Sequence, residues 1–392
     1  MLNETDRLFT CAYCRVKSCL LPPKGVFRYL LPHVADPGKQ VVYFPYWRYR
    51  GTRFCCIENE IRHQHVDVTH QAVESPYFPA SMGLRAQAMR LAFVSPHTAG
   101  RFLAPALSIR DILLQRENRL KTEMASRKVY YQSHVGEVLS LIYSPFYIDE
   151  QLVDAVLNRT VSGPLPDSFM NTLTKSGRPD WQMQFLSAMC PSCGWNLSGE
   201  RNAIVLTCAN CNSAWQPIGG SLKPVPVAFF PDDAADLFLP FWRIKAEVSG
   251  IPLASYADLV HLANLPRVVQ PGWDQMEFRF WSLAFKLSPK AFLSLSIRMN
   301  LTQPREELKS GNPPGAIYPT TLSVTEAVDT MKTTLAGMMK PADTGFAKLP
   351  QIHIKALRFV LVYVPFRSGY QEWLQSQYSI AINKNLLSLT DH

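Results

Sequence analysis

Four cysteines near the middle of the chain have the spacing of a metal site. Cys190 and Cys193 form one C-x-x-C pair, Cys208 and Cys211 form a second, and 14 residues separate the two pairs. Such pairs supply four thiolates to a tetrahedral ion, because each short turn lets both of its sulfurs face the same metal. A glycine follows the first pair and an asparagine the second, and both residue types accept the positive φ of such a turn. With Cys at all four positions, we expect a structural zinc ion and no open coordination position.

The whole segment 185–220 resembles a zinc ribbon. The run Ala203 to Thr207 between the pairs predicts a strand, and Trp195 and Trp215 follow the turns and could cover the small site. Two alternatives stay open at this point: an iron or Fe–S centre, which also takes four thiolates, and four buried thiols without a metal.

Two further groups of residues could bind metal. Cys11, Cys14 and Cys19 combine a C-x-x-C pair with a third thiol near the start of the chain, which predicts a second metal site unless these are buried thiols. Candidates for its fourth ligand are His33, Cys55 and Cys56. The other group lies on one face of an expected strand and consists of His63, His65 and Asp67. Imidazole and carboxylate could bind a metal, but a solvated strand surface is the simpler interpretation.

Composition limits the class of protein. The 392 residues are 47% hydrophobic and 18% charged, which excludes an intrinsically disordered chain. No apolar run is long enough for a transmembrane helix, and the N-terminus lacks the pattern of a signal peptide, so we expect a cytoplasmic protein. No Walker A, G-x-G-x-x-G, G-x-S-x-G or H-E-x-x-H motif occurs. We therefore expect no enzymatic activity and identify no small-molecule substrate.

The net charge of +9 is mild. Its densest basic cluster lies in an expected helix over 109–128 and is interleaved with glutamates; it comprises Arg116, Arg119, Lys121, Arg127 and Lys128. This pattern is typical of a solvated helix face, although nucleic acid or an acidic protein surface would also suit it.

An internal repeat organises the chain. YFPYWRYR at 43–50 matches FLPFWRIK at 238–245, and LIYSPFY at 141–147 matches LVYVPFR at 361–367. Between these pairs, ALSIRDIL at 106–113 matches TLSVTEAV at 321–328, and Ala88 is matched with Ala291. The matches keep their order, and the first cysteine pair precedes the first copy as the ribbon precedes the second, which predicts duplication of one module.

These observations predict an α+β, β-rich fold in which a β-hairpin-rich module is duplicated in tandem, with a zinc ribbon before the second copy. We expect an N-terminal Cys knuckle at 1–40, a first module at 41–162, a linker at 163–184, the ribbon at 185–220 and a second module at 221–392. A hairpin is expected at 53–69, helices at 109–128 and 324–339, and a further linker at 217–233. Proline inside the repeated strands predicts that each is an edge strand or carries a bulge.

The repeated strands also offer candidate partner-binding residues. Trp47, Arg48, Trp242 and Arg243 are of the types enriched at interface hot spots, although they could equally belong to the cores of the modules. The PYWR and PFWR strands beside C-x-x-C turns resemble those of uncharacterised bacterial zinc-ribbon proteins, a resemblance that implies no activity. We expect a non-enzymatic adaptor subunit of a multiprotein complex. Nucleic-acid binding and an Fe–S accessory role in a redox complex are the alternatives.

Overall fold

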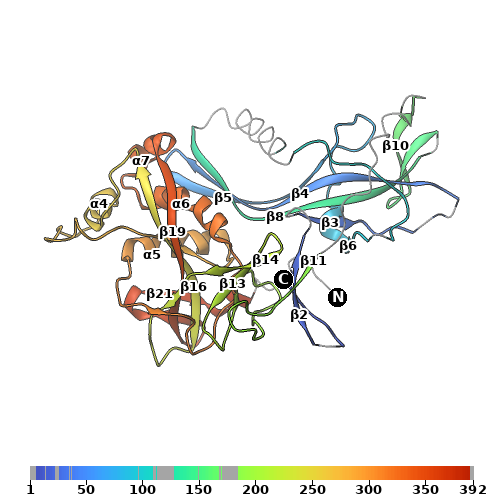
Figure 1. Ribbon diagram of the computed structural model, residues 1–392. Coiled ribbons are helices and arrows are strands. Elements are labelled where there is room, and N and C mark those ends of the chain that lie inside the picture. Colours follow the sequence, from blue (N-terminus) through green and yellow to red (C-terminus); the bar gives the residue numbers. More distant parts are fainter. Residues whose placement is uncertain are drawn as a thin grey trace.

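The computed structural model describes residues 6–13, 15–22, 26–34, 36, 38–95, 97–108, 112, 128–148, 150–166, 169 and 184–388. The protein is built mainly of β-strands, with helices gathered at one end (Figure 1). None of the helices in the described residues has the length and apolar character needed to span a bilayer.

The first large sheet is centred on two long antiparallel strands, β4 (Val41–Ile57) and β8 (Val129–Ile148). Its remaining strands are β3 (Phe27–Leu30), β5 (Glu60–Gln71), β6 (Ala92–Phe93), β7 (Arg101–Phe102), β9 (Gln151–Asp154) and β10 (Arg159–Pro164). The β4–β5 hairpin confirms the predicted one, with its turn at Glu58. Alternate side chains of β4 enter different clusters, Phe44 on one face and Tyr43 on the other, so both faces of the sheet are covered.

The second large sheet is centred on β16 (Leu237–Ser249) and β19 (His353–Ser368). Its other strands are β15 (Val227–Phe229), β17 (Phe280–Leu283), β18 (Lys309–Ser310), β20 (Glu372–Gln375) and β21 (Ile380–Asn383). The associated helices are α4 (Tyr256–Leu262), α5 (Pro289–Thr302), α6 (Val324–Met338), α7 (Ala342–Lys348), η2 (Leu349–Gln351), η3 (Ser376–Tyr378) and α8 (Lys384–Ser388). The predicted helix at 324–339 is confirmed as α6, which begins at a capping box formed by Ser323 and Glu326.

Corresponding strands pair in the same way within each of the two large sheets. β4 and β8 pair Pro45 with Tyr143, and β16 and β19 pair Pro240 with Tyr363, so the repeated motifs meet in the same register. β3 runs parallel to β8 as β15 runs parallel to β19, and β6 flanks β3 as β18 flanks β15. A duplicated module would give this arrangement.

Two of the repeated motifs meet in one hydrogen-bonded clamp. The Pro45 carbonyl accepts from the Ala72 amide at 2.9 Å, and the Ala72 carbonyl accepts from the amides of Ala106 and Leu107, both at 2.8 Å. The Trp47 indole then donates to the Leu107 carbonyl at 2.8 Å. Pro45 has no amide hydrogen to donate to the Ala72 carbonyl, so the amides of Ala106 and Leu107 satisfy this carbonyl instead.

The second sheet repeats this clamp. Pro240 accepts from Ala284 at 3.0 Å, Ala284 accepts from the amides of Thr321 and Leu322, and the Trp242 indole donates to the Leu322 carbonyl at 2.8 Å. Of the two alternatives predicted from proline, the edge position is wrong for β4, which pairs with β5 and β8 on its two sides. The bulge is present in both strands, as a register shift after Arg50 in β4 and after Lys245 in β16.

The first sheet reaches the helices of the second. β4 carries a register shift between Arg50 and Thr52, where a Cβ on Gly51 would lie only 3.0 Å from the Val135 carbonyl oxygen. Such a bulge bends a strand. Beyond it, Phe54 and Cys56 join the large core that contains α6, and Figure 1 shows β4, β5 and β8 extending to these helices.

Two small sheets surround the cysteine-rich segment. β1 (Leu8–Thr10), β2 (Lys17–Leu21) and β11 (Gln184–Ser187) form one, and β12 (Leu206–Thr207), β13 (Ala214–Ile218) and β14 (Ser221–Val225) form the other. The structure thus differs from the expected boundaries: β3 lies within 1–40 but belongs to the first large sheet. The expected linker at 217–233 contains β14 and β15, so the ribbon's sheet ends at Val225 and not at residue 220.

Other expectations fare differently. The short helix α1 (Arg85–Ala88) and α5 occupy corresponding connections, and Ala72 corresponds to Ala284 and Val94 to Gly311 in the flanking hydrogen bonds. The match of Ala88 with Ala291 lies between these two pairs and keeps their order, and it stays a prediction. Most of the expected helix at 109–128 and of the linker at 163–184 lies outside the described residues.

Candidate metal centre

Two tight turns position the four central thiols. The Cys190 amide donates to the Trp195 carbonyl at 2.7 Å, and the Gly194 amide donates back to the Cys190 carbonyl at 2.8 Å. The Cys208 amide makes the corresponding bond to Ser213 at 2.8 Å. Gly194 and Asn212 both have positive φ, 73° and 52°, which confirms the expectation from their residue types.

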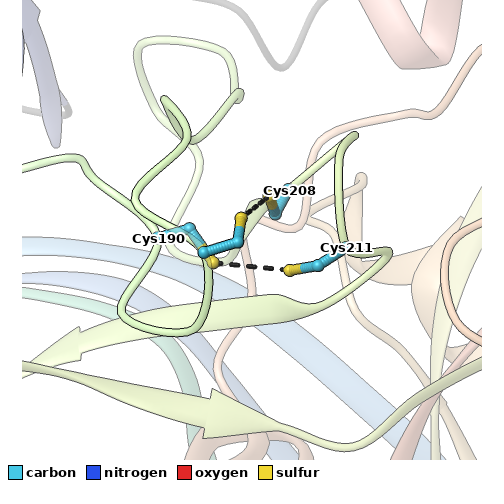
Figure 2. Close-up of side chains that lie close together, drawn as sticks. Cys190, Cys208 and Cys211 are labelled. Atoms are coloured by element: carbon cyan, nitrogen blue, oxygen red, sulfur yellow. Dashed lines mark hydrogen bonds between the residues drawn. The ribbon is translucent and has the colours of Figure 1, made fainter.

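The thiols of Cys190, Cys193, Cys208 and Cys211 lie within 4.8 Å of one another. Two sulfur–sulfur distances, Cys190 to Cys211 and Cys193 to Cys208, are both 3.5 Å, and Figure 2 shows the labelled sulfurs converging. Four sulfurs at about 2.3 Å from one tetrahedral ion would be about 3.8 Å apart. The donor set therefore fits a thiophilic metal ion.

The immediate surroundings favour thiolates on part of the site. Burial opposes ionisation of Cys190, but hydrogen bonds from the Ser213 hydroxyl and from nearby amides outweigh it and lower its pKa to about 6. Burial dominates at Cys208 and raises the pKa of that thiol to about 11. Because metal ligation requires deprotonated sulfur, a bound cation would have to overcome this burial at Cys208.

Side chains outside the C-x-x-C pairs hold the second turn in place. Ser213 Oγ lies 3.0 Å from Cys211 Sγ and accepts from the Trp215 indole at 2.7 Å. Asn312, two residues after the end of β18, donates to the Ser213 carbonyl at 3.1 Å. The sequence analysis missed Ser213 and Asn312. Ser213 could have been noticed as a hydroxyl two residues after a ligand, whereas nothing in the sequence around Asn312 indicates its contact.

The ribbon segment also packs against the start of the chain. Leu8 and Cys19 share a buried cluster with Cys190, Cys208 and Trp215. The amides of Arg7 and Leu8 donate to the Arg201 carbonyl at 2.6 and 2.9 Å. The cysteine site therefore lies where the N-terminal hairpin, the ribbon and the second sheet meet.

The first C-x-x-C pair begins a turn like those of the ribbon. The Cys11 amide donates to Val16 at 3.0 Å, the Arg15 amide donates to Cys11 at 3.0 Å, and Arg15 has a φ of 57°. Thr10 pairs with Lys17 as Met189 pairs with Asn196 beside the Cys190 turn. The described residues at 10–13 and 15–17 thus share these hydrogen bonds and this strand pairing with 189–196.

Among the described residues, the other thiols proposed for the second site form no metal-binding group with Cys11. Cys14 lies outside the described residues. Cys19 is buried in the apolar cluster, where burial raises its pKa to about 11 and disfavours the thiolate. Cys55 and Cys56 lie in β4. Among the described residues, the four ribbon cysteines are the one group of three or more His, Cys, Asp or Glu residues with metal-binding proximity.

The face formed by His63, His65 and Asp67 is not a metal-binding group among the described residues. Asp67 accepts hydrogen bonds from Nε and Nη2 of Arg48, at 2.9 and 2.8 Å, and the His63 ring lies tilted against Phe54. The described residues thus place these groups in side-chain contacts of the sheet, with no metal cluster among them.

The candidate partner-binding residues are mostly inside the protein. Trp242 is fully buried and Arg48 is 4% exposed, while Trp47 and Arg243 are half-buried. Both tryptophans donate hydrogen bonds within the clamps, and Arg48 forms an ion pair with Asp67. Arg243 lies over the Trp281 ring. As a correction, Trp242 and Arg48 belong to the module cores. Trp215 covers the cysteine site from within, whereas Trp195 is 59% exposed.

Comparison with protein-family models, curated proteins and solved structures finds no match to this chain.

Proposed function

We propose that the protein is a zinc-stabilised, non-enzymatic adaptor or structural subunit of a cytoplasmic multiprotein complex. The observation that supports this most is the position of the four-thiol site. Its ligands come from one segment, but its surroundings include the N-terminal hairpin and Asn312 from the segment after β18. A zinc ion there would supply charge neutralisation and rigid tetrahedral bonding, with cysteines at all four positions and none left for a substrate.

We also propose that the two large sheets arose by duplication of one module. The shared registers and the two clamps support this, as do the matching backbone turns at Cys11 and Cys190. A duplicated scaffold offers two related platforms, which suits a subunit that joins other proteins.

The alternatives remain distinguishable. The four thiolates would also hold iron, which a coloured, iron-containing preparation would reveal. Nucleic-acid binding depends on the basic segment 116–127, which lies outside the described residues, and predicts binding that weakens steeply with salt. The site at Cys11, Cys14 and Cys19 stays a prediction, now favoured only for its first two residues.

The test is affinity purification of the full chain from its native host, followed by metal analysis and identification of co-purifying proteins. We expect a colourless protein with zinc and a stoichiometric partner. A metal-free or iron-loaded protein would contradict the zinc assignment. A strictly monomeric protein without a stable partner would contradict the adaptor role.

A further inference from the structure

A groove of about 1000 Å³ runs beside α5. Its apolar lining comprises Ile61, Leu265, Leu293, Ile297 and Leu301. Three of these lie on α5 at intervals of four residues, so they form one stripe along the helix. The opposite face of α5, which includes Phe292, Leu295 and Met299, is buried in the main core. The helix therefore presents a second, partly exposed apolar stripe to the groove.

The floor of this α5 groove is held in place from below. A Cβ on Gly337 of α6 would come within 2.3 Å of Ile297 Cδ1 and 3.5 Å of Ile61 Cδ1, so both side chains rest over this glycine. The loop at 265–267 and the segment 377–379 contribute the remaining walls. The groove is thus lined by β5 of the first large sheet and by α5 and loops that pack beside the second.

The rim of the α5 groove is basic. Its titratable lining residues that can carry positive charge are His63, Arg267, Lys290 and Arg298. Among the described residues, none that lines the groove is a carboxylate. The carboxylate that contacts its wall is Glu306, whose oxygens accept from Gln377 Nε2 at 2.5 Å and Tyr378 Oη at 2.6 Å. Two rim cations have fixed positions, because Arg267 donates to the Tyr256 hydroxyl and Arg298 to the Ser379 carbonyl.

We propose that the α5 groove binds an acidic amphipathic helix of a partner protein. This inference rests on the proposed adaptor function and names the surface and the partner chemistry. A helix lying along α5 would place apolar residues at i, i+4 and i+7 against Leu293, Ile297 and Leu301, and its acidic flanks against the basic rim. Fourteen residues of α5 span about 21 Å, enough for about four turns of such a helix.

The shape and residue types favour this occupant over others with negative charge. A flat anionic membrane could not follow a concave groove to its apolar floor. A single-stranded nucleic acid would favour several exposed aromatic rings for stacking, but among the described lining residues Tyr378 is 4% exposed and bound to Glu306, which leaves the single imidazole of His63 exposed.

The test uses the full-length protein and a fluorescent synthetic helix of about 15 residues with leucines at i, i+4 and i+7 and glutamates elsewhere. A control peptide carries lysines in place of the glutamates. By fluorescence anisotropy we expect salt-sensitive binding of the acidic peptide and at least about tenfold weaker binding of the basic one. Equal binding of the two peptides, or no binding of the acidic one, would overturn the proposal, as would an oligonucleotide that displaces the peptide at equal concentration.

Variants locate the site. We expect Lys290→Glu and Arg298→Glu, both at exposed positions, to weaken binding of the acidic peptide by about tenfold each. Lys355→Glu, at an exposed position of β19 that does not line the groove, is the matched control and should leave binding unchanged. Circular dichroism confirms folding of each variant. Unchanged affinity in both groove variants would refute the assigned surface.

The native-host purification separates this inference from the adaptor role. If the wild type retains a partner and the Lys290→Glu, Arg298→Glu double variant retains it equally, the groove assignment is wrong and the adaptor role stands. If the wild type has no partner, the adaptor role fails whatever the peptide result.

Discussion

The two repeated tryptophans do the same work at the level of single residues. Trp47 and Trp242 each donate an indole N–H to a carbonyl, at Leu107 and Leu322, on the segment that follows the corresponding connection. Each segment is also held by the Ala72 or Ala284 carbonyl. The Pro–aromatic–Trp motif and the distant ALS and TLS motifs are therefore two halves of one contact, which explains why both recur.

Loss of the buried clamp donor should cost more than loss of the half-buried one. We expect Trp242→Phe to lower the free energy of unfolding by about 2–4 kcal/mol, because it removes buried volume and leaves the Leu322 carbonyl without its indole donor. Trp47→Phe should cost about 1–2 kcal/mol, since Trp47 is half-buried and water can replace part of the bond. Urea unfolding of both variants measures the difference, and equal losses would contradict this assignment.

The metal ligands allow a second test at this scale. Cys193→Ser should remove the bound metal and lower the free energy of unfolding by more than about 3 kcal/mol, because metal binding is coupled to folding of the ribbon. Cys56→Ser is the control: Cys56 is fully buried in β4, apart from the ribbon. It should lose stability but keep its metal by elemental analysis. Full metal retention in Cys193→Ser would refute the site.

What could be predicted at residue scale follows the range of the interaction. The thiols and the positive φ of Gly194 and Asn212 come from spacing and residue type within one turn. Asn312 contacts the ribbon from about a hundred residues away, and its role depends on packing that no local pattern encodes. For Trp242 the sequence left an interface and a core as alternatives, because both use the same aromatic side chains and only the packing decides between them.

At the scale of elements, two helices begin with reciprocal capping boxes. Asp258 in the first turn of α4 accepts from the amides of Ala254 and Ser255, at 2.9 and 2.8 Å, and from the Ser255 hydroxyl. Glu326 of α6 accepts in the same way from Ser323. These bonds satisfy amides that the helix itself leaves without partners.

The α4 box should make stability depend on pH. Burial opposes ionisation of Asp258, but its hydrogen bonds from Ala254 and Ser255 outweigh burial and lower its pKa below 3.8. Since the pKa is lower in the folded state, the carboxylate stabilises the fold above about pH 4, and this contribution is lost as the pH falls through the folded value. We expect Asp258→Asn to cost about 1 kcal/mol at pH 7 and progressively less below about pH 4. Chemical unfolding at several pH values measures it.

Asp343, an exposed residue in the first turn of α7, is the matched control. Asp343→Asn should change the free energy of unfolding by less than about 0.5 kcal/mol. A cost for Asp258→Asn that stays constant from pH 7 to pH 3 would contradict the capping explanation.

Sequence patterns predicted single strands and helices better than the contacts that those elements make with one another. The β4–β5 hairpin follows from two strand-like runs around a turn at 58–60, and α6 follows from the repeat, as the counterpart of the helix expected at 109–128. The position of Pro45 in a paired central strand could not be predicted. Proline has no amide hydrogen to donate to the Ala72 carbonyl beside it, and this carbonyl instead accepts from the amides of Ala106 and Leu107, 34 and 35 residues further on. The repeat could be recognised before its structural reason was apparent.

For the whole molecule, the main consequence of the fold is that the two large sheets are not independent. Phe54, Cys56 and Val135 of the first sheet belong to the same core as α6 and β19. The repeat predicted two modules joined by a linker, since each copy has its own pattern. The bulge at Gly51 bends the first sheet toward the helices of the second, a long-range result that the pattern within one copy does not contain.

The seam between the sheets can be measured directly. Ser133 of β8 and Thr333 of α6 are 7% and 1% exposed, and their hydroxyl oxygens lie 2.7 Å apart. Removing either hydroxyl leaves the other buried with a lost partner, whereas removing both leaves an apolar contact. We expect the Ser133→Ala, Thr333→Val double variant to lose about 1 kcal/mol less than the sum of the single losses. All four proteins should unfold in one transition. Additive losses, or two separate transitions by tryptophan fluorescence and circular dichroism, would show that the two sheets fold independently despite their shared core.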